Sequence, residues 1–225
     1  MRVTRFVLLL TALAAASVNA AQAQTTLRPD EGRFLAMFTV AATLGHKSDS
    51  SVGVEVGGRL TDSIEVFIEA GRMGNVATST LDTRASVIAN FIKGSASAVQ
   101  KATFFDIGVK YRGPVIGALP GMWRPYIGIG VGTAKVNTTV NFAVNGTDVT
   151  AQLLPLYGIE LGNDLSDSLN KTFVVVPLGI QGRFMDRFVV DAGYRYGRIS
   201  ARPEDIDNDV AIGTQRVQVG FGVRF

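Results

Sequence analysis

The final segment of the chain, Gln215 to Phe225, alternates strictly between two kinds of side chain. Valine and phenylalanine occupy every second position from Val217 to Phe225, and arginine, glutamine and glycine occupy the positions between them. A period of two predicts a β-strand with one apolar and one polar face. A strand of this kind that ends on an aromatic residue suits a transmembrane barrel, whose outer face contacts lipid and whose interior is polar.

Further runs with the same period precede this strand. They are Arg33 to Leu44, Ser51 to Leu60, Ile64 to Arg72, Thr103 to Arg112, Pro125 to Val136, Lys171 to Phe184 and Phe188 to Arg198. Their lengths are typical of membrane-spanning strands, which have about 9–11 residues. Because Pro177 has no N–H to donate, we expect a bulge or local kink in the sixth run.

These runs predict an all-β fold, namely a closed, antiparallel, up-and-down transmembrane barrel of eight strands. Mean hydropathy is +0.24, yet no apolar run after the amino-terminal segment is long enough for a membrane helix, which needs about 20 residues. Strands hide such hydrophobicity in alternate positions. A ten-stranded barrel stays open as an alternative, because Thr147 to Leu161 could extend the sheet. A soluble barrel with an apolar interior is disfavoured by the signal peptide and the loop lengths.

The amino-terminal segment, residues 1–23, predicts a secretory signal peptide. Arg2 and Arg5 precede the apolar run from Phe6 to Ala16, and Ala21-Gln22-Ala23 provides a small-residue cleavage site. The barrel domain is then expected at residues 24–225. Removing this peptide deletes two of the 22 basic residues and no acidic ones, so the net charge falls from +3 to +1. The charge therefore gives no reason to expect a nucleic-acid partner.

The connections between the predicted strands alternate in length. Short turns are expected at residues 61–63 and 185–187, and long polar loops at residues 73–102, 137–170 and 199–214. Short turns at one rim and long loops at the other are typical of outer-membrane barrels. Residues 113–124 are an exception, since this connection is long where a short turn is expected. Asp82 to Ile92 has the composition of a short amphipathic helix.

Charged residues collect on the faces predicted to point inward. The predicted lumen charge network comprises Glu55, Arg59, Glu65, Glu69, Asp106, Lys110, Asp191, Arg195 and Arg216, and Arg112 and Arg224 share the same phase. Because an eight-stranded barrel has an interior just wide enough for side chains to fill, we expect these groups to bond to one another. Tyr111, Trp123, Tyr126, Tyr194 and Tyr196 are expected outside the lumen, at the membrane interface.

Signals for catalysis and cofactors are weak. The chain has no cysteine and one histidine, so no metal or cofactor is expected. His46 and Ser48 are two residues apart and would share a face on a strand, as a base and a nucleophile require. They lie in a short loop, however, with only Asp49 nearby as an acid. A solvated loop histidine is the favoured interpretation, and no enzyme activity is expected.

Four blocks of residues together resemble a known family. They are Gly58 to Ile64, Pro125 to Gly130, Asp191 to Tyr196 and the terminal Phe225. In their order they resemble the small eight-stranded outer-membrane β-barrel proteins of Gram-negative bacteria, of the OmpA/OmpX, opacity and porin-like type. The resemblance implies export by the Sec route and residence in the bacterial outer membrane among lipid and lipopolysaccharide. It also implies recognition of Phe225 by the barrel-assembly machinery.

Three functions remain open at this stage. The first is a structural and surface-interaction role, in which long outer loops contact a surface ligand, because loops on a rigid scaffold carry such contacts. The second is a narrow, porin-like diffusion channel through the lumen. The third is a lipid A-modifying barrel enzyme centred on His46 and Ser48.

Overall fold

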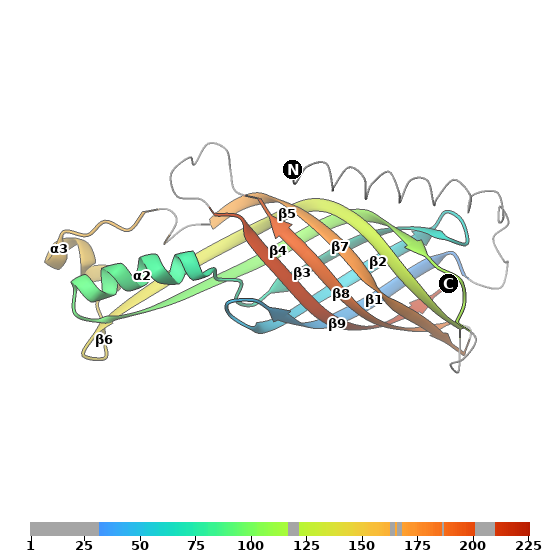
Figure 1. Cartoon of the computed structure of the whole chain (residues 1–225), viewed down its shortest axis with the longest axis horizontal. Helices are drawn as coiled ribbons and strands as arrows, with labels where there is room; N and C mark the ends of the chain where they lie inside the picture. The colour runs from blue at the N-terminus through green and yellow to red at the C-terminus, as the bar shows by residue number, and fades with distance from the viewer. Residues whose placement is uncertain (1–31, 117–121, 163–164, 166–167, 186, 201–209) are drawn as a thin grey trace, which may run out of the picture.

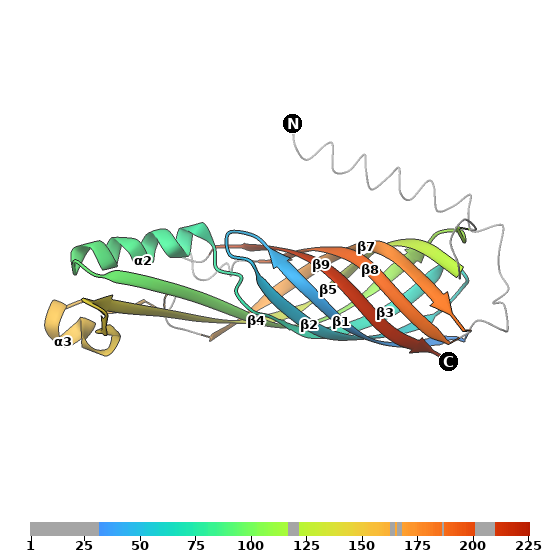
Figure 2. The same cartoon turned by 90° about the horizontal axis from the view of Figure 1, so that it is seen from below.

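The computed structural model describes residues 32–116, 122–162, 165, 168–185, 187–200 and 210–225. The predicted signal peptide lies outside these residues. Figures 1 and 2 show an elongated molecule, with a barrel of tilted strands at one end and a narrower extension at the other. None of the helices in the described ranges combines the length and apolar character that a membrane-spanning helix needs.

Strands make up most of the described chain. In order, the elements are β1 (Phe34–Leu44), β2 (Asp49–Arg59), β3 (Ile64–Met73), α2 (Ser79–Phe91), β4 (Ser95–Arg112), β5 (Met122–Val144), β6 (Thr147–Asp148), η1 (Thr150–Gln152), α3 (Leu153–Tyr157), β7 (Ser168–Phe184), β8 (Phe188–Ile199) and β9 (Ile212–Arg224). All strands belong to one antiparallel sheet, in which β6 pairs only with the end of β5. The other eight strands close into a barrel because β1 pairs with β9 and β4 pairs with β5. The eight-stranded barrel is therefore confirmed. The ten-stranded alternative is wrong, because the elements within residues 147–157 are the two-residue β6, which pairs only with β5, and the helical segments η1 and α3.

The alternation of side chains places the two faces as the sequence predicts. On β2, Val52, Val54 and Val56 are exposed, whereas Gly53 and Glu55 are buried inside the barrel. The same pattern holds on β9, where Val217, Val219 and Phe221 point outward. The outer surface therefore carries a belt of aliphatic and aromatic residues, as a barrel in contact with lipid requires.

The two rims of the barrel differ. One rim, here called the turn end, carries the β2–β3 turn, in which Leu60 N donates to Ile64 O at 2.9 Å, and the carboxyl terminus. At the opposite rim, the extended end, β4 and β5 continue past their neighbours. Pairing of β3 with β4 stops at Ala102, and pairing of β7 with β5 stops at Asn137. Beyond these residues β4 and β5 form a two-stranded ribbon (Figure 2).

This ribbon corrects the predicted loops. Residues 73–102 and 137–170 were expected to be long polar loops, yet β4 begins at Ser95 and β5 runs to Val144. The prediction failed because it looked for apolar residues on the outer face. In the ribbon, the face that continues the barrel interior is the apolar one, with Ala98, Val140 and Phe142 buried, and the other face carries serine, threonine, asparagine and lysine.

Helix α2 covers the apolar face of the ribbon. Thr78 caps the helix by accepting a hydrogen bond from Leu81 N at 3.3 Å, which satisfies one otherwise free N–H of the first turn. Leu81, Ala85 and Ala89 then recur on one face and are buried against the ribbon. The helix was predicted at Asp82 to Ile92, so its existence is confirmed and its start lies three residues earlier. Beside it, α3 lies at the far end of the extension (Figure 1).

Pro177 lies at a gap in the pairing between β5 and β7, and the register of the two strands does not change across it. Pairing of β5 with β7 is absent between Ile127↔Leu178 and Gly130↔Val175, and the register is the same on both sides of this gap. On its other side, Pro177 pairs in register with Arg195 of β8. Of the bulge or local kink expected here, the bulge is absent, and the local irregularity is a short gap in the ladder between β5 and β7.

Candidate functional site

The barrel interior holds every member of the predicted charge network. Glu55, Arg59, Glu65, Glu69, Asp106, Lys110, Asp191, Arg195 and Arg216 are each at most 5% exposed. They come from β2, β3, β4, β8 and β9, and each lies on the inward phase of its strand. Burying a charge is costly unless it is paired, so the partners of each group decide what the interior can do.

Arg195 is the centre of this network. It extends from β8 to contact two carboxylates on the far side of the barrel, through Glu55 Oε2 and through Glu69 Oε2 at 2.9 Å. Lys110 Nζ holds the other oxygen of Glu55, and Arg216 Nη1 donates to Glu69 Oε1 at 3.2 Å. Three cations thus bridge two carboxylates, and together they join five strands across the lumen.

Two neutral side chains continue the chain of contacts. Arg195 Nε donates to Gln218 Oε1 at 2.7 Å, and Gln218 Nε2 lies 3.4 Å from Asp191 Oδ1. The same Asp191 oxygen accepts a hydrogen bond from the Tyr126 hydroxyl at 3.0 Å. Tyr126 therefore lies inside the lumen, which corrects the expectation that it faces the membrane interface. It has the inward phase of β5, and this phase, not residue type, decides its direction.

A second group of charges lies toward the turn end. Arg224 Nη2 donates to both Glu65 Oε2 and Gln181 Oε1, each at 2.8 Å. Arg112 Nη1 lies 3.8 Å from the same Glu65 oxygen. Arg59, the last residue of β2, is buried at this end as well. This group joins β3 to β4, β7 and β9.

An apolar plug fills the lumen toward the extended end. Its members are Met73, Val76, Ala102, Phe104, Ala134, Val136, Phe173, Val175, Ile199 and Ile212. The rings of Phe104 and Phe173 lie 5.6 Å apart, and the guanidinium of Arg216 lies 4.3 Å from the Phe104 ring. The plug was not predicted from the sequence, because the prediction for the lumen was based on the inward charges alone. The signal was present in Phe104, Phe173 and Val175, which are apolar residues with the inward phase.

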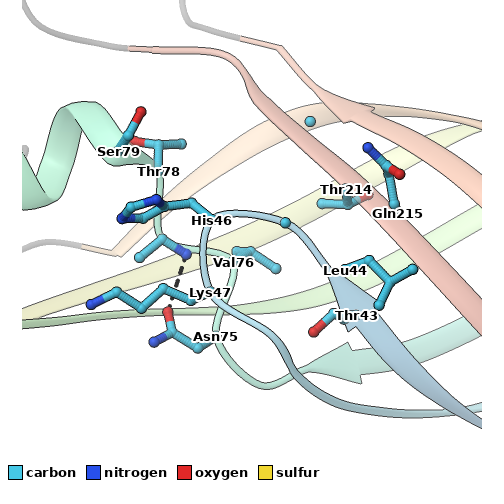
Figure 3. A pocket seen from close by; sticks show the side chains of 13 residues that line it. Thr43, Leu44, His46, Lys47, Asn75, Val76, Thr78, Ser79, Thr214 and Gln215 are labelled. Carbon is cyan, nitrogen blue, oxygen red and sulfur yellow. Dashed lines mark hydrogen bonds between the residues drawn. The ribbon is translucent and has the colours of Figure 1, made fainter.

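A small cleft opens at the extended end, beside the barrel mouth (Figure 3). It has a volume of about 200 Å³ and lies between the β1–β2 loop, the segment before α2 and the start of β9. Asn75 supports it, since Asn75 Oδ1 accepts from the backbone N–H groups of Ala77 and Gln100, each at 3.1 Å. Hydroxyl and amide groups of Thr43, Thr214 and Gln215 also line it, together with His46. The cleft can therefore accommodate a small polar group.

His46 contacts an acid that the sequence did not suggest. Its Nε2 lies 2.7 Å from Asp82 Oδ2 of α2, and Lys47 Nζ lies 2.9 Å from the same oxygen. Asp49, the acid nearest in sequence, accepts from the backbone N–H of Ser50. Among the described residues, Ser48 makes no hydrogen bond to His46. The geometry thus ties the β1–β2 loop to α2 and does not assemble a base with a nucleophile.

These contacts predict a pH dependence of the loop. Partial burial opposes it, but the hydrogen bonds from Lys47 and His46 hold the pKa of Asp82 below its ordinary value of 3.8. A depressed pKa means that the contact contributes stability above about pH 3.8 and is lost as the pH falls below that value. We expect hydrogen exchange in α2 to accelerate below this pH in the wild type. In Asp82→Asn the exchange should already be faster at pH 7 and should not change further at the acid transition.

The described residues contain no group of three or more His, Cys, Asp or Glu side chains that could hold a metal ion. The described strands form a closed antiparallel barrel with a polar interior and an apolar outer belt. This architecture defines a transmembrane β-barrel protein. The sequence profile of the outer membrane protein beta-barrel domain matches residues 7–225. The chain belongs to this family of bacterial outer-membrane proteins.

Several solved structures are similar to this chain at low sequence identity. Neisserial surface protein A is 14% identical, with 85% of this chain and 96% of that one covered and a TM-score of 0.49. The amino-terminal barrel of OprF from Pseudomonas aeruginosa is 14% identical over 86% and 99%, with a TM-score of 0.46. Ail, the attachment invasion locus protein of Yersinia pestis, is 19% identical over 87% and 99%, with a TM-score of 0.45. No curated protein matches the sequence.

Proposed function

We propose that this protein is a closed outer-membrane barrel with a structural and surface-interaction role, carried by the extension of β4, β5, α2 and α3. The observation that carries the proposal is the contrast between the two parts. The lumen is crossed by bonded charges and filled by the apolar plug, whereas the extension has its own core and still exposes large apolar side chains. These are Val87 and Phe91 on α2, and Leu154 and Leu156 on α3, each at least 59% exposed.

Exposed apolar residues of this kind are typical of surfaces that contact a partner. Val87 and Phe91 are four residues apart and therefore lie on one face of α2, opposite the face that packs on the ribbon. The extension is also continuous with the barrel, because β4 and β5 run through both. A continuous scaffold of this kind presents a contact surface away from the membrane.

In the proposed orientation, the turn end faces the periplasm and the extension faces the outside of the cell. The chain has no cysteine, so single cysteines give a clean test. Leu156→Cys on α3 should react with a membrane-impermeant maleimide on intact cells. Met185→Cys, at the turn end and 86% exposed, should react only after the outer membrane is permeabilised. The opposite labelling pattern would overturn the proposed orientation and surface role.

A closed lumen gives a separate prediction for conductance. Purified barrel inserted into planar bilayers should show no steady single-channel current, because charge contacts and the apolar plug occupy the interior. Shortening the plug with the double variant Phe104→Ala and Phe173→Ala should produce measurable current, since both rings lie in the lumen. Steady current through the wild type would favour the narrow-channel alternative.

Export and assembly complete the proposal. We propose that residues 1–23 direct Sec export, and that the assembly machinery recognises the strand ending in Phe225. Its ring is 65% exposed and lies 6.1 Å from the ring of Phe34, at the turn end. Lipid and lipopolysaccharide would then surround the belt. No enzyme activity is part of the proposal, so expression should leave the acyl content of lipid A unchanged when measured by mass spectrometry.

A further inference from the structure

Asp106 is a buried acid without a partner. It lies in the middle of β4, is 0% exposed, and neither of its carboxylate oxygens has a hydrogen-bond partner among the described residues. It also lies in a row of acids. Glu55 pairs across strands with Glu69, and Glu69 pairs in turn with Asp106. Like charges placed directly opposite one another in a sheet destabilise it unless cations separate them.

The three cations of the network contact two other acids, Glu55 and Glu69. Lys110 and Arg195 hold Glu55, and Arg195 and Arg216 hold Glu69. Asp191 of β8 accepts from the Tyr126 hydroxyl and lies 3.4 Å from Gln218 Nε2. On the β5 side, the residue paired with Asp106 is Gly132, which has no side chain to offer.

A count of the charges around Asp106 also leaves it without a cation of its own. The charged groups that contact one another in this part of the lumen, from β2, β3, β4, β8 and β9, are the acids Glu55, Glu69 and Asp191 and the cations Lys110, Arg195 and Arg216. Tyr126 of β5 is bonded to Asp191 and is neutral. With Asp106 included, four carboxyl groups face three cations. One negative charge is left over in a space without exposure to solvent. Arginine keeps its charge in proteins, whereas a carboxyl group can be neutralised by taking up a proton.

We propose that Asp106 is a proton-binding site of the barrel interior, and that it is a neutral carboxylic acid in the folded protein at pH 7. An ionised carboxylate there would have no hydrogen-bond donor and would share Arg195 and Arg216 with Glu69, which is costly for a buried acid. One bound proton removes the excess charge and supplies an O–H donor beside the row of carboxylates. The site goes beyond the proposed surface role, because it lies in the lumen and involves no loop.

The competing arrangement involves Arg216. Its Nε and Nη2 are also buried without hydrogen-bond partners. A water molecule or a small movement could therefore join Arg216 to an ionised Asp106. This arrangement makes Asp106 a structural ion-pair partner, and it gives opposite results in the two measurements below.

The first measurement is infrared spectroscopy of the full barrel in lipid vesicles at pH 7. The wild type should show the C=O stretching band of a protonated carboxyl group, and this band should disappear in Asp106→Asn. It should persist in Glu65→Gln, the matched control, because the carboxylate of Glu65 is paired with Arg224 and Arg112 in the separate group toward the turn end. Absence of the band from the wild type, or its persistence in Asp106→Asn, would overturn the proposal.

The second measurement is thermal unfolding, followed by heat-modified gel migration. Asn resembles a neutral Asp, so Asp106→Asn should unfold within roughly 3 °C of the wild type, where a shift of about 2–4 °C corresponds to 1 kcal/mol. Glu69→Gln, which removes an ionised partner of two arginines, should unfold roughly 10 °C lower. Raising the pH from 7 to about 10 should lower the unfolding temperature of the wild type more than that of Asp106→Asn. A loss in Asp106→Asn equal to that in Glu69→Gln would show that Asp106 is ionised and paired.

Discussion

Arg195→Ala is expected to lower the free energy of unfolding by about 3–5 kcal/mol, because removing one partner of buried ion pairs leaves the remaining charges less well compensated. Arg195 is 0% exposed and holds Glu55, Glu69 and Gln218 at once. Its loss leaves each carboxylate with a single cation. Urea unfolding of the barrel in lipid vesicles, followed by tryptophan fluorescence, measures the difference, since Trp123 is the only tryptophan.

Arg198 provides the matched control for this variant. It lies on the same strand with its side chain exposed, so Arg198→Ala should change the free energy of unfolding by no more than about 0.5 kcal/mol. Arg195→Lys keeps the charge but lacks the forked guanidinium, and we expect an intermediate loss. If Arg195→Ala were as stable as Arg198→Ala, the network would not hold the barrel together.

Phe221→Arg is expected to destabilise the barrel in lipid by about 2–4 kcal/mol, the cost of a basic residue at the middle of the lipid face. Phe221 lies midway along the apolar face of β9, is 58% exposed and pairs across strands with Phe38. Its surroundings are therefore lipid on one side and the apolar belt on the other. The fraction of folded protein recovered from vesicles, and its urea unfolding there, both report the effect.

The loss of stability caused by an arginine should depend on its position along the strand. Val217→Arg, nearer the extended end, should cost less because the cost falls toward the interface. Thr139→Arg, on the exposed face of the ribbon, should cost no more than about 0.5 kcal/mol. Equal tolerance of Phe221→Arg and Thr139→Arg would contradict contact between the belt and lipid.

Sequence patterns predicted the strands best where lipid covers the outer face. On β2 and β9, the alternation alone identified the strand, its register and its inward residues, and the structure agrees. The same approach missed the ribbon, because the apolar side chains of β4 and β5 lie on the outer face in the barrel and on the inner face in the ribbon. At Phe105 the outer side chain points to lipid, whereas at Ala98 the inner side chain packs in the core formed with α2. A prediction that assumes an apolar outer face therefore fails where the strands leave the lipid and pack against α2.

The candidate site shows a similar division. Inward phase placed Glu55, Glu69 and Arg195 in the lumen, but it gave no information on which acid pairs with which cation. Tyr126 was misplaced because its residue type was given more weight than its phase. The contact between His46 and Asp82 joins residues 36 positions apart. No local pattern predicts that the β1–β2 loop and α2 meet at the barrel mouth.

The amino-acid sequence by itself determined the strand period, the outward belt and the set of inward charges, because the direction of a side chain on a strand depends only on its position parity. The tertiary structure alone decided the pairing of charges across the lumen, the apolar plug and the isolation of Asp106. Those features depend on which strands lie opposite one another once the sheet closes. Closure brings β2 and β3 within reach of β8, and this proximity gives Arg195 its two carboxylate partners. It leaves Asp106 without a hydrogen-bond partner among the described residues.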